Sequence, residues 1–137
     1  MTPEEIDRFA FEGYPALERS GIRCETAERG RITTRWPHDE AQLRPGGYIA
    51  GPTQFMVADT ALWFLAFTVV GLEAMAVTSD LHLVFLRPAI GDDLWAEATT
   101  VAVTKRRMYG TVRLWVGDTP DRTVSHATGS YALPATD

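Results

Sequence analysis

A chain of 137 residues, 45% of them hydrophobic and 23% charged, fits one globular domain that can bury a core without help from metals or disulfides. The formal net charge of −5 argues against a nucleic-acid partner, because binding to phosphates requires a basic surface. Cys24 is the only cysteine, which excludes an internal disulfide and a cysteine-based zinc site, and it fits a reducing cytoplasm. We therefore expect a single cytoplasmic domain over residues 1–137.

The N-terminal segment, residues 1–21, predicts short helices. Thr2, Pro3 and the two acids that follow are typical of a helix start, and Pro15 divides the segment in two. The first nine residues are acidic and lack the apolar core of a signal peptide. We therefore expect this segment to be helical and not to direct secretion.

Residues 52–70 predict one long central helix that is apolar almost all round. Pro52 suits the first helical position, the segment lacks the alternation of a strand, and Gly71 is a plausible end. The longest apolar run, from Ala61 to Leu72, is shorter than the ~20 residues that a membrane span requires. We therefore expect a helix buried inside the protein, and no membrane partner.

Strands are predicted on both sides of this helix. Residues 108–116 alternate apolar and polar side chains, as a half-buried antiparallel strand does. The predicted strands cover residues 22–28, 31–36, 74–86, 94–104, 108–116 and 123–133. Residues 37–47, which are polar and rich in Pro and Gly, predict a loop. An antiparallel sheet wrapped around one central helix satisfies this order, because the helix must bury all its faces.

Asp59 is the one acid in the long helix. Its neighbours three and four residues away are Phe55, Met56, Leu62 and Trp63, none of which can pair with a carboxylate. A buried carboxylate without a partner is costly, so a catalytic role is favoured. Two alternatives stay open. Either this face of the helix meets solvent, or backbone N–H groups of another segment satisfy a structural acid.

Three stretches of the sequence resemble a known family. ADTALW in the helix, VTSDLHLVFLRPAIGDDLWAEA after it and the ending SHATGSYAL resemble the hotdog-fold acyl-CoA thioesterases of the phenylacetate-pathway (PaaI-like) type. The resemblance covers roughly residues 41–133 and implies an α+β hotdog fold. It also implies an acyl-CoA substrate without a metal or tightly bound cofactor. The implied assembly is a homodimer with two sites at its interface, or a homotetramer built as a dimer of dimers.

The resemblance further implies roles for two residues. The family usually begins this helix with His-Gly-Gly and places the acid eight residues after the first glycine, so counting back from Asp59 gives Gly51. The Gly51 N–H would polarise the thioester carbonyl, and Asp59 of the other subunit would be the general base or nucleophile. Backbone N–H groups at a helix N-terminus do stabilise developing negative charge. Ala50 and Pro52 depart from the family pattern, which removes one side chain and one N–H.

Other residues are weaker candidates, each with an ordinary alternative. By resemblance, Thr78 would orient substrate or water, but threonine is also common in strands. Arg44 stands where the family often has asparagine and would hold the substrate, or it lies in a solvated loop, which is slightly favoured. Arg106 and Arg107 would bind the phosphates of coenzyme A, although solvated charges at a hairpin turn are the favoured interpretation.

Met56 and Trp63 are the remaining candidates, as side chains that line an acyl pocket. His82 lies four residues after Thr78, so we expect it to point the same way along the strand, and an outward histidine is favoured over a catalytic one. The three histidines share no short ligand spacing, so no metal site is predicted.

The sequence thus predicts a thioesterase that hydrolyses a small aromatic or medium-chain acyl-CoA, with coenzyme A present only as part of the substrate. One alternative is a non-catalytic protein that binds acyl-CoA, which the missing His-Gly-Gly favours. A second is a hotdog hydratase or dehydratase, which ranks lower because no histidine or further acid has a supportive spacing from Asp59. Whether Asp59 acts as base or nucleophile stays open.

Overall fold

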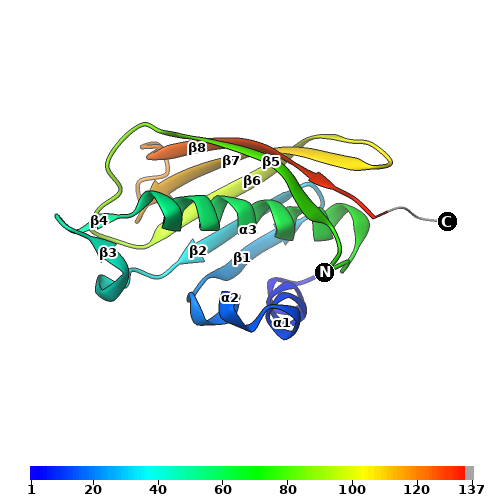
Figure 1. Cartoon of the computed structure of the whole chain (residues 1–137), viewed down its shortest axis with the longest axis horizontal. Helices are drawn as coiled ribbons and strands as arrows, with labels where there is room; N and C mark the ends of the chain where they lie inside the picture. The colour runs from blue at the N-terminus through cyan, green and yellow to red at the C-terminus, as the bar shows by residue number, and fades with distance from the viewer. Residues whose placement is uncertain (135–137) are drawn as a thin grey trace.

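The computed structural model describes residues 1–134, in which a six-stranded antiparallel sheet curves around one long helix (Figure 1). The strands are β1 (Arg23–Glu28), β2 (Arg31–Trp36), β5 (Val77–Phe85), β6 (Leu94–Val103), β7 (Arg107–Val116) and β8 (Ser125–Ala132). They lie in the order β1-β2-β6-β7-β8-β5, so β1 and β5 form the two edges. The central helix is α3 (Gly51–Val70). The predicted α+β hotdog fold is confirmed.

Helix α3 lies along the inner face of the sheet and supplies much of the core. It begins at Gly51, one residue before the predicted start, and ends at Val70, followed by Gly71, whose φ of 91° favours glycine. By length and composition α3 is apolar enough to cross a membrane, but 56% of its most apolar stretch is buried in this protein. Phe55 stays 44% exposed, so a single chain does not bury every face of the helix as expected.

Two glycines let the helix approach the sheet closely. A Cβ added to Gly110 on β7 would lie 2.8 Å from Leu62 Cδ2, and one added to Gly129 on β8 would lie 2.9 Å from Leu62 Cδ1. Leu62 is fully buried, as are Phe64 and Phe67 on the same helix. The two glycines therefore set the distance between α3 and the sheet at the middle of the core.

The N-terminal helices α1 (Pro3–Gly13) and α2 (Pro15–Arg19) are divided at Pro15, as predicted. Helix α1 packs beside β1, where the Asp7 carboxylate accepts a hydrogen bond of 2.9 Å from the Cys24 N–H. The Phe9 ring meets the Phe67 ring edge to face at 5.4 Å, which ties α1 to the end of α3. The N-terminal segment is thus part of the folded core.

Residues 37–47 are more ordered than the predicted loop. They contain a single 3₁₀ turn, η1 (Glu40–Gln42), and the two-residue strand β3 (Leu43–Arg44), which pairs with β4 (Tyr48–Ile49). Strands of two residues are too short to leave a periodic pattern, so the sequence could not predict them. This ribbon leads the chain directly into the N-terminus of α3.

Strand β5 contains a bulge that corrects one expectation. Thr78 pairs with Tyr131, but His82 pairs with Thr128, because the register shifts between Thr78 and Asp80. Thr78 and His82 therefore point to opposite faces of the sheet, with Thr78 inward and His82 outward. The extra residue of a bulge reverses the alternation, so the prediction that Thr78 and His82 point the same way was wrong. The favoured outward position of His82 is confirmed.

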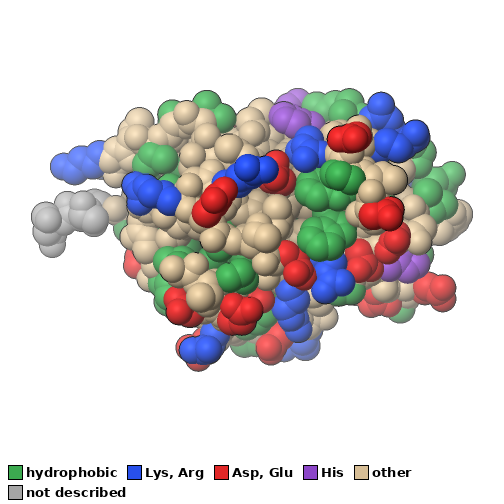
Figure 2. Space-filling model, turned by 180° about the vertical axis from the view of Figure 1, so that it is seen from behind, with side chains coloured by type: hydrophobic (Ala, Val, Ile, Leu, Met, Phe, Trp, Pro, Cys, Tyr) green, Lys and Arg blue, Asp and Glu red, His purple; other side chains and the backbone are tan. Residues whose placement is uncertain are grey.

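The outer face of the sheet carries acidic and basic side chains mixed together (Figure 2). Glu97 on β6 forms ion pairs with Arg31 at 2.8 Å and with Arg113 at 3.7 Å, and Arg35 forms one with Glu25 at 2.9 Å. The indole rings of two tryptophans stack across β6 and β7 with their centroids 6.3 Å apart. Among the described residues, this face shows no broad surface of a single charge.

Candidate active site

Asp59 is held by two hydroxyl groups from the sheet. Thr78 Oγ1 donates a hydrogen bond of 2.7 Å to Asp59 Oδ1, and Tyr131 Oη donates one of 2.6 Å to the same oxygen. Tyr131 Oη also lies 2.9 Å from the Asp59 carbonyl oxygen. The expectation of a carboxylate without partners was therefore wrong. Both partners come from distant strands, which the helical neighbours of Asp59 cannot reveal.

The pairing of β5 with β8 positions these two hydroxyls together. Thr78 and Tyr131 are direct partners in the register of the two strands, and both point inward to α3. Tyr131 is only 4% exposed. Burial, and then the neighbouring charge of Asp59, raise the pKa of the Tyr131 phenol well above its usual range. The phenol therefore keeps its proton and acts as a donor to the carboxylate.

Tyr131 is the residue that sequence reasoning missed. It lies in the stretch SHATGSYAL, which is one of the three that resemble the family. A tyrosine near the end of a strand is, however, ordinarily expected to be a core residue. The available signal was the antiparallel pairing of the last strand with the strand that contains Thr78. Without the register of that pairing, the contact of Tyr131 with Asp59 cannot be inferred.

A cavity of about 420 Å³ adjoins the Asp59 carboxylate. Its walls are mostly apolar and include Trp63 from α3, Leu17 from α2 and Tyr14 from the junction of α1 and α2. The expected place of Trp63 beside Asp59 agrees with this cavity. Met56 does not line it; its sulfur accepts a hydrogen bond of 3.7 Å from the Thr60 hydroxyl instead.

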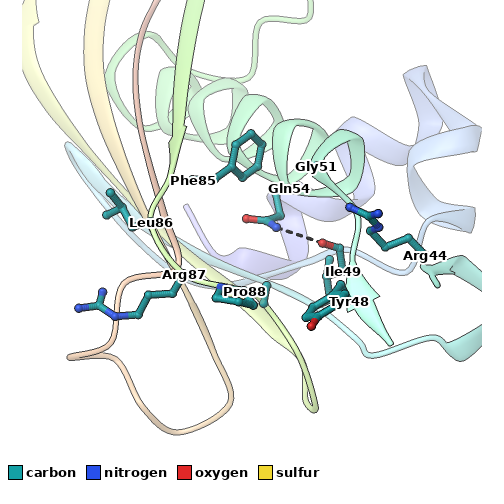
Figure 3. Close-up of a pocket in the computed structure, with 10 residues that line it drawn as sticks. Arg44, Tyr48, Ile49, Gly51, Gln54, Phe85, Leu86, Arg87 and Pro88 are labelled. Atoms are coloured by element: carbon teal, nitrogen blue, oxygen red, sulfur yellow. Dashed lines mark hydrogen bonds between the residues drawn. The ribbon is translucent and has the colours of Figure 1, made fainter. Parts of the chain in front are cut away.

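A second cavity, of about 500 Å³, lies at the N-terminus of α3 (Figure 3). Gly51 lines it together with Arg44 from β3 and Phe85 from the end of β5. The helix start has no side-chain cap, because Ala50 occupies the N-cap position. Gln54 is 4% exposed and donates from Nε2 to the Ile49 carbonyl at 3.1 Å, which fastens the helix to β4. Arg44 thus shares a cavity with Gly51.

A single chain does not bring Gly51 and Asp59 together. Eight residues of helix separate them by ~12 Å along the axis. The two cavities that they line share no residue. The chain therefore carries the carboxylate and the helix N-terminus in two separate cavities.

The basic residues of the β6–β7 turn lie apart from both cavities. The hairpin turn itself was predicted correctly. The Arg107 guanidinium donates to the Ser79 hydroxyl, and the Arg106 carbonyl accepts from the Leu133 N–H at 2.8 Å. Phosphate binding by Arg106 and Arg107 stays a prediction. Within residues 1–134, no three His, Cys, Asp or Glu side chains gather as metal ligands.

Comparison with known proteins identifies the family. The sequence profile of the Thioesterase superfamily matches residues 46–122, which is more than half of the chain. The comparison with curated proteins found no match. A candidate thioesterase of Silicibacter sp. TM1040 is 27% identical in sequence, and its structure has a TM-score of 0.88 over 98% of this chain and 92% of that one.

Two further solved structures share the fold at lower identity. A thioesterase family protein of Silicibacter pomeroyi is 22% identical, with a TM-score of 0.86 over 97% of this chain and 98% of that one. The E. coli PaaI protein, from the phenylacetic acid degradation operon, is 23% identical, with a TM-score of 0.77 over 94% and 95% of the two chains. The chain therefore belongs to the thioesterase superfamily and has the hotdog fold of its PaaI-like members.

Proposed function

We propose that this protein hydrolyses acyl-CoA thioesters at sites formed between two subunits. The observation that carries the proposal is the Asp59 carboxylate, which is oriented by two hydroxyls and adjoins a mostly apolar cavity. A carboxylate so placed is suited to take a proton from water or to attack a carbonyl. The Gly51 N–H at the start of α3 is suited to receive the negative charge that develops on the carbonyl oxygen.

A homodimer formed through β5 supports a complete site. β5 is an edge strand, and its apolar side chains Val77, Val84 and Phe85 are 54%, 42% and 54% exposed. A long apolar edge strand is a template for pairing with another chain. Antiparallel pairing with a second copy about a twofold axis places the last residues of one β5 beside the first residues of the other.

The contacts at the two ends of β5 support this proposed dimer. At the end of the strand, the Phe85 ring lies against Gly51, since a Cβ on that glycine would be 3.2 Å from Cζ. At the start of the strand, Thr78 binds Asp59. Pairing of two copies therefore moves Gly51 of one subunit towards Asp59 of the other. A further association into a dimer of dimers is compatible with this arrangement.

The reaction follows from these positions. The acyl group would lie in the cavity with Trp63, whose volume suits a small aromatic or medium-length chain. Water would attack the carbonyl carbon and give its proton to Asp59, the C–S bond would break, and the proton would pass to the departing thiolate. Direct attack by Asp59, followed by hydrolysis of the anhydride, yields the same acid and free coenzyme A. Arg44 and the β6–β7 turn would meet the polar parts of coenzyme A.

A second candidate function is acyl-CoA binding without turnover. The observation that favours it is the chemistry before α3, where Ala50 and Pro52 leave the Gly51 N–H without a neighbouring histidine or a second glycine N–H. Catalysis would then depend on a single oxyanion donor. The two candidates make different predictions for the release of free thiol.

The test is a panel of acyl-CoA thioesters assayed for free thiol, with wild type beside Asp59→Asn. We expect turnover of at least one thioester, and a loss of about 10²–10⁴-fold in Asp59→Asn. Asn keeps the size of the side chain, so matching melting temperatures would exclude unfolding as the cause. A wild type that turns over no thioester but is stabilised by acyl-CoA supports the binding protein. An Asp59→Asn variant that is as active as wild type would contradict the proposed mechanism.

A further inference from the structure

Both hydroxyls that contact Asp59 donate to the same oxygen. Thr78 Oγ1 and Tyr131 Oη lie 2.7 Å and 2.6 Å from Oδ1. Among residues 1–134, no group donates a hydrogen bond to Oδ2. An ionised carboxylate oxygen has about two lone pairs directed at donors, so Oδ1 is already saturated. The two oxygens of this carboxylate are therefore chemically different before any substrate arrives.

We propose that Tyr131 is a positioning residue of the thioesterase reaction, and that with Thr78 it occupies Oδ1 so that Oδ2 alone takes the proton or attacks the carbonyl. The inference rests on the proposed function and names a member of the same site. Tyr131 does not itself exchange a proton with the substrate. Its role is to fix the rotation of the Asp59 carboxylate and to stabilise its ionised form.

The surroundings of Tyr131 make it the more rigid of the two donors. Its backbone pairs with Thr78 on one side and with Met108 on the other, and its ring is 4% exposed. Thr78, in contrast, is exposed in a single subunit and belongs to an edge strand with a bulge next to it. Tyr131 thus ties the carboxylate to a strand that is paired on both sides, whereas Thr78 ties it to the edge strand. The larger share of the positioning is assigned to Tyr131.

The same geometry leaves the Asp59 carboxylate without a charged neighbour in its cavity. Among residues 1–134, Asp59 is the only charged side chain that lines this cavity, and the other titratable side chains there are Tyr131 from β8 and Tyr14 from the junction of α1 and α2. Hydrogen bonds from the two hydroxyls are therefore the interactions that stabilise its negative charge and hold its orientation.

The test is Tyr131→Phe, which removes the hydroxyl and keeps the buried ring. We expect kcat to fall about 10- to 100-fold with KM little changed, because the lost bond is to a charged group in the reacting machinery. Thr78→Val removes the other donor and should also lower kcat, by a smaller factor than Tyr131→Phe.

Tyr109→Phe is the matched control, because Tyr109 is 42% exposed on the outer face of β7. It should alter neither kcat nor KM. A Tyr131→Phe protein that melts like wild type and keeps its kcat would overturn the proposal. A variant in which only KM changes would overturn it as well.

A measurement without turnover separates this proposal from the proposed function. Carbon NMR of the Asp59 side-chain carboxyl reports the hydrogen bonds to this group in wild type and in Tyr131→Phe. A carboxyl signal that changes in Tyr131→Phe but not in Tyr109→Phe supports the positioning role of Tyr131 even if no thioester is hydrolysed, in which case the proposed function alone has failed. The same signal in all three proteins overturns the positioning role even if the protein is an active thioesterase.

Discussion

The separation of Gly51 and Asp59 predicts how mixed forms of the proposed dimer behave. Gly51→Pro removes the proposed oxyanion donor and Asp59→Asn removes the proposed base, so each homodimer has two incomplete sites. If every site takes Gly51 from one subunit and Asp59 from the other, a heterodimer of these variants has one site with both defects and one site with neither. Two inactive proteins should therefore combine into an active one.

The size of the effect follows from the structure. Gly51→Pro is a mild change for the fold, because proline suits the first turn of a helix and Ala50 already has φ −65° and ψ 151°, a conformation allowed before proline. The added side chain meets the end of the Phe85 ring at 3.2 Å, where a small shift suffices. Losing one oxyanion donor lowers kcat by about 10²–10³. The heterodimer should keep about half of wild-type activity, which is at least ~50 times that of either homodimer.

The assay is free-thiol release by heterodimers that carry two different affinity tags and are purified through both after co-expression. Gly51→Ala is the matched control for the proline variant, since it keeps the N–H and should be active as a homodimer. A doubly purified heterodimer that is as inactive as either parent would refute the reasoning. Both groups of a site would then have to come from one subunit.

Three further predictions concern other parts of the molecule. Gly129→Ala should lower the free energy of unfolding by about 1–3 kcal/mol, because the added Cβ would lie 2.8 Å from the Asp80 backbone oxygen. Thermal melts measure this change, and Gly13→Ala is the control that should leave stability nearly unchanged, because the space around Gly13 is open. Burial raises the pKa of Asp7 from 3.8 to about 6, so the folded protein holds this proton more tightly than the unfolded chain. Wild type should therefore lose stability relative to Asp7→Asn as pH rises from 3.8 to about 6, measured by denaturant unfolding at several pH values. Trp63→Phe should enlarge the cavity beside the acid and raise kcat/KM for longer acyl chains about 10-fold relative to shorter ones; an unchanged chain-length profile would contradict the place given to the acyl group.

The fold was predictable because its signals are local. The alternation of residues 108–116 and the unbroken apolar character of 52–70 define a strand and a buried helix within short windows. The pairing β3–β4 was missed because two-residue strands carry no period. The bulge in β5 was missed for a related reason, since one extra residue changes the face of His82 without changing any residue type.

The site was predictable only in part, because its members meet through long-range pairing. Asp59 is conspicuous in the sequence as the sole acid of an apolar helix, and Gly51 follows from a fixed spacing in the family that it resembles. Tyr131 lies 72 residues after Asp59, and its contact depends on the register of β5 with β8. The neighbours of Asp59 along the helix offer it no partner, and both of its partners come from the sheet.

The proposed dimer contact and the catalytic site constrain each other through β5. Thr78 is the second residue of this strand and Phe85 is its last. Antiparallel pairing about a twofold axis at Leu81 would place Thr78 of one copy opposite Val84 of the other. Thr78 would then lie beside the neighbouring Phe85, whose ring packs on Gly51. A slip of two residues along the strand would move the partner by ~7 Å. An N–H and a carboxylate displaced by that distance could no longer reach one thioester carbonyl, because both must lie within hydrogen-bonding or attacking range of it. Only one register therefore serves both the interface and the chemistry, so a substitution on the exposed edge of β5 that changes this register should abolish activity while leaving the fold of each subunit intact.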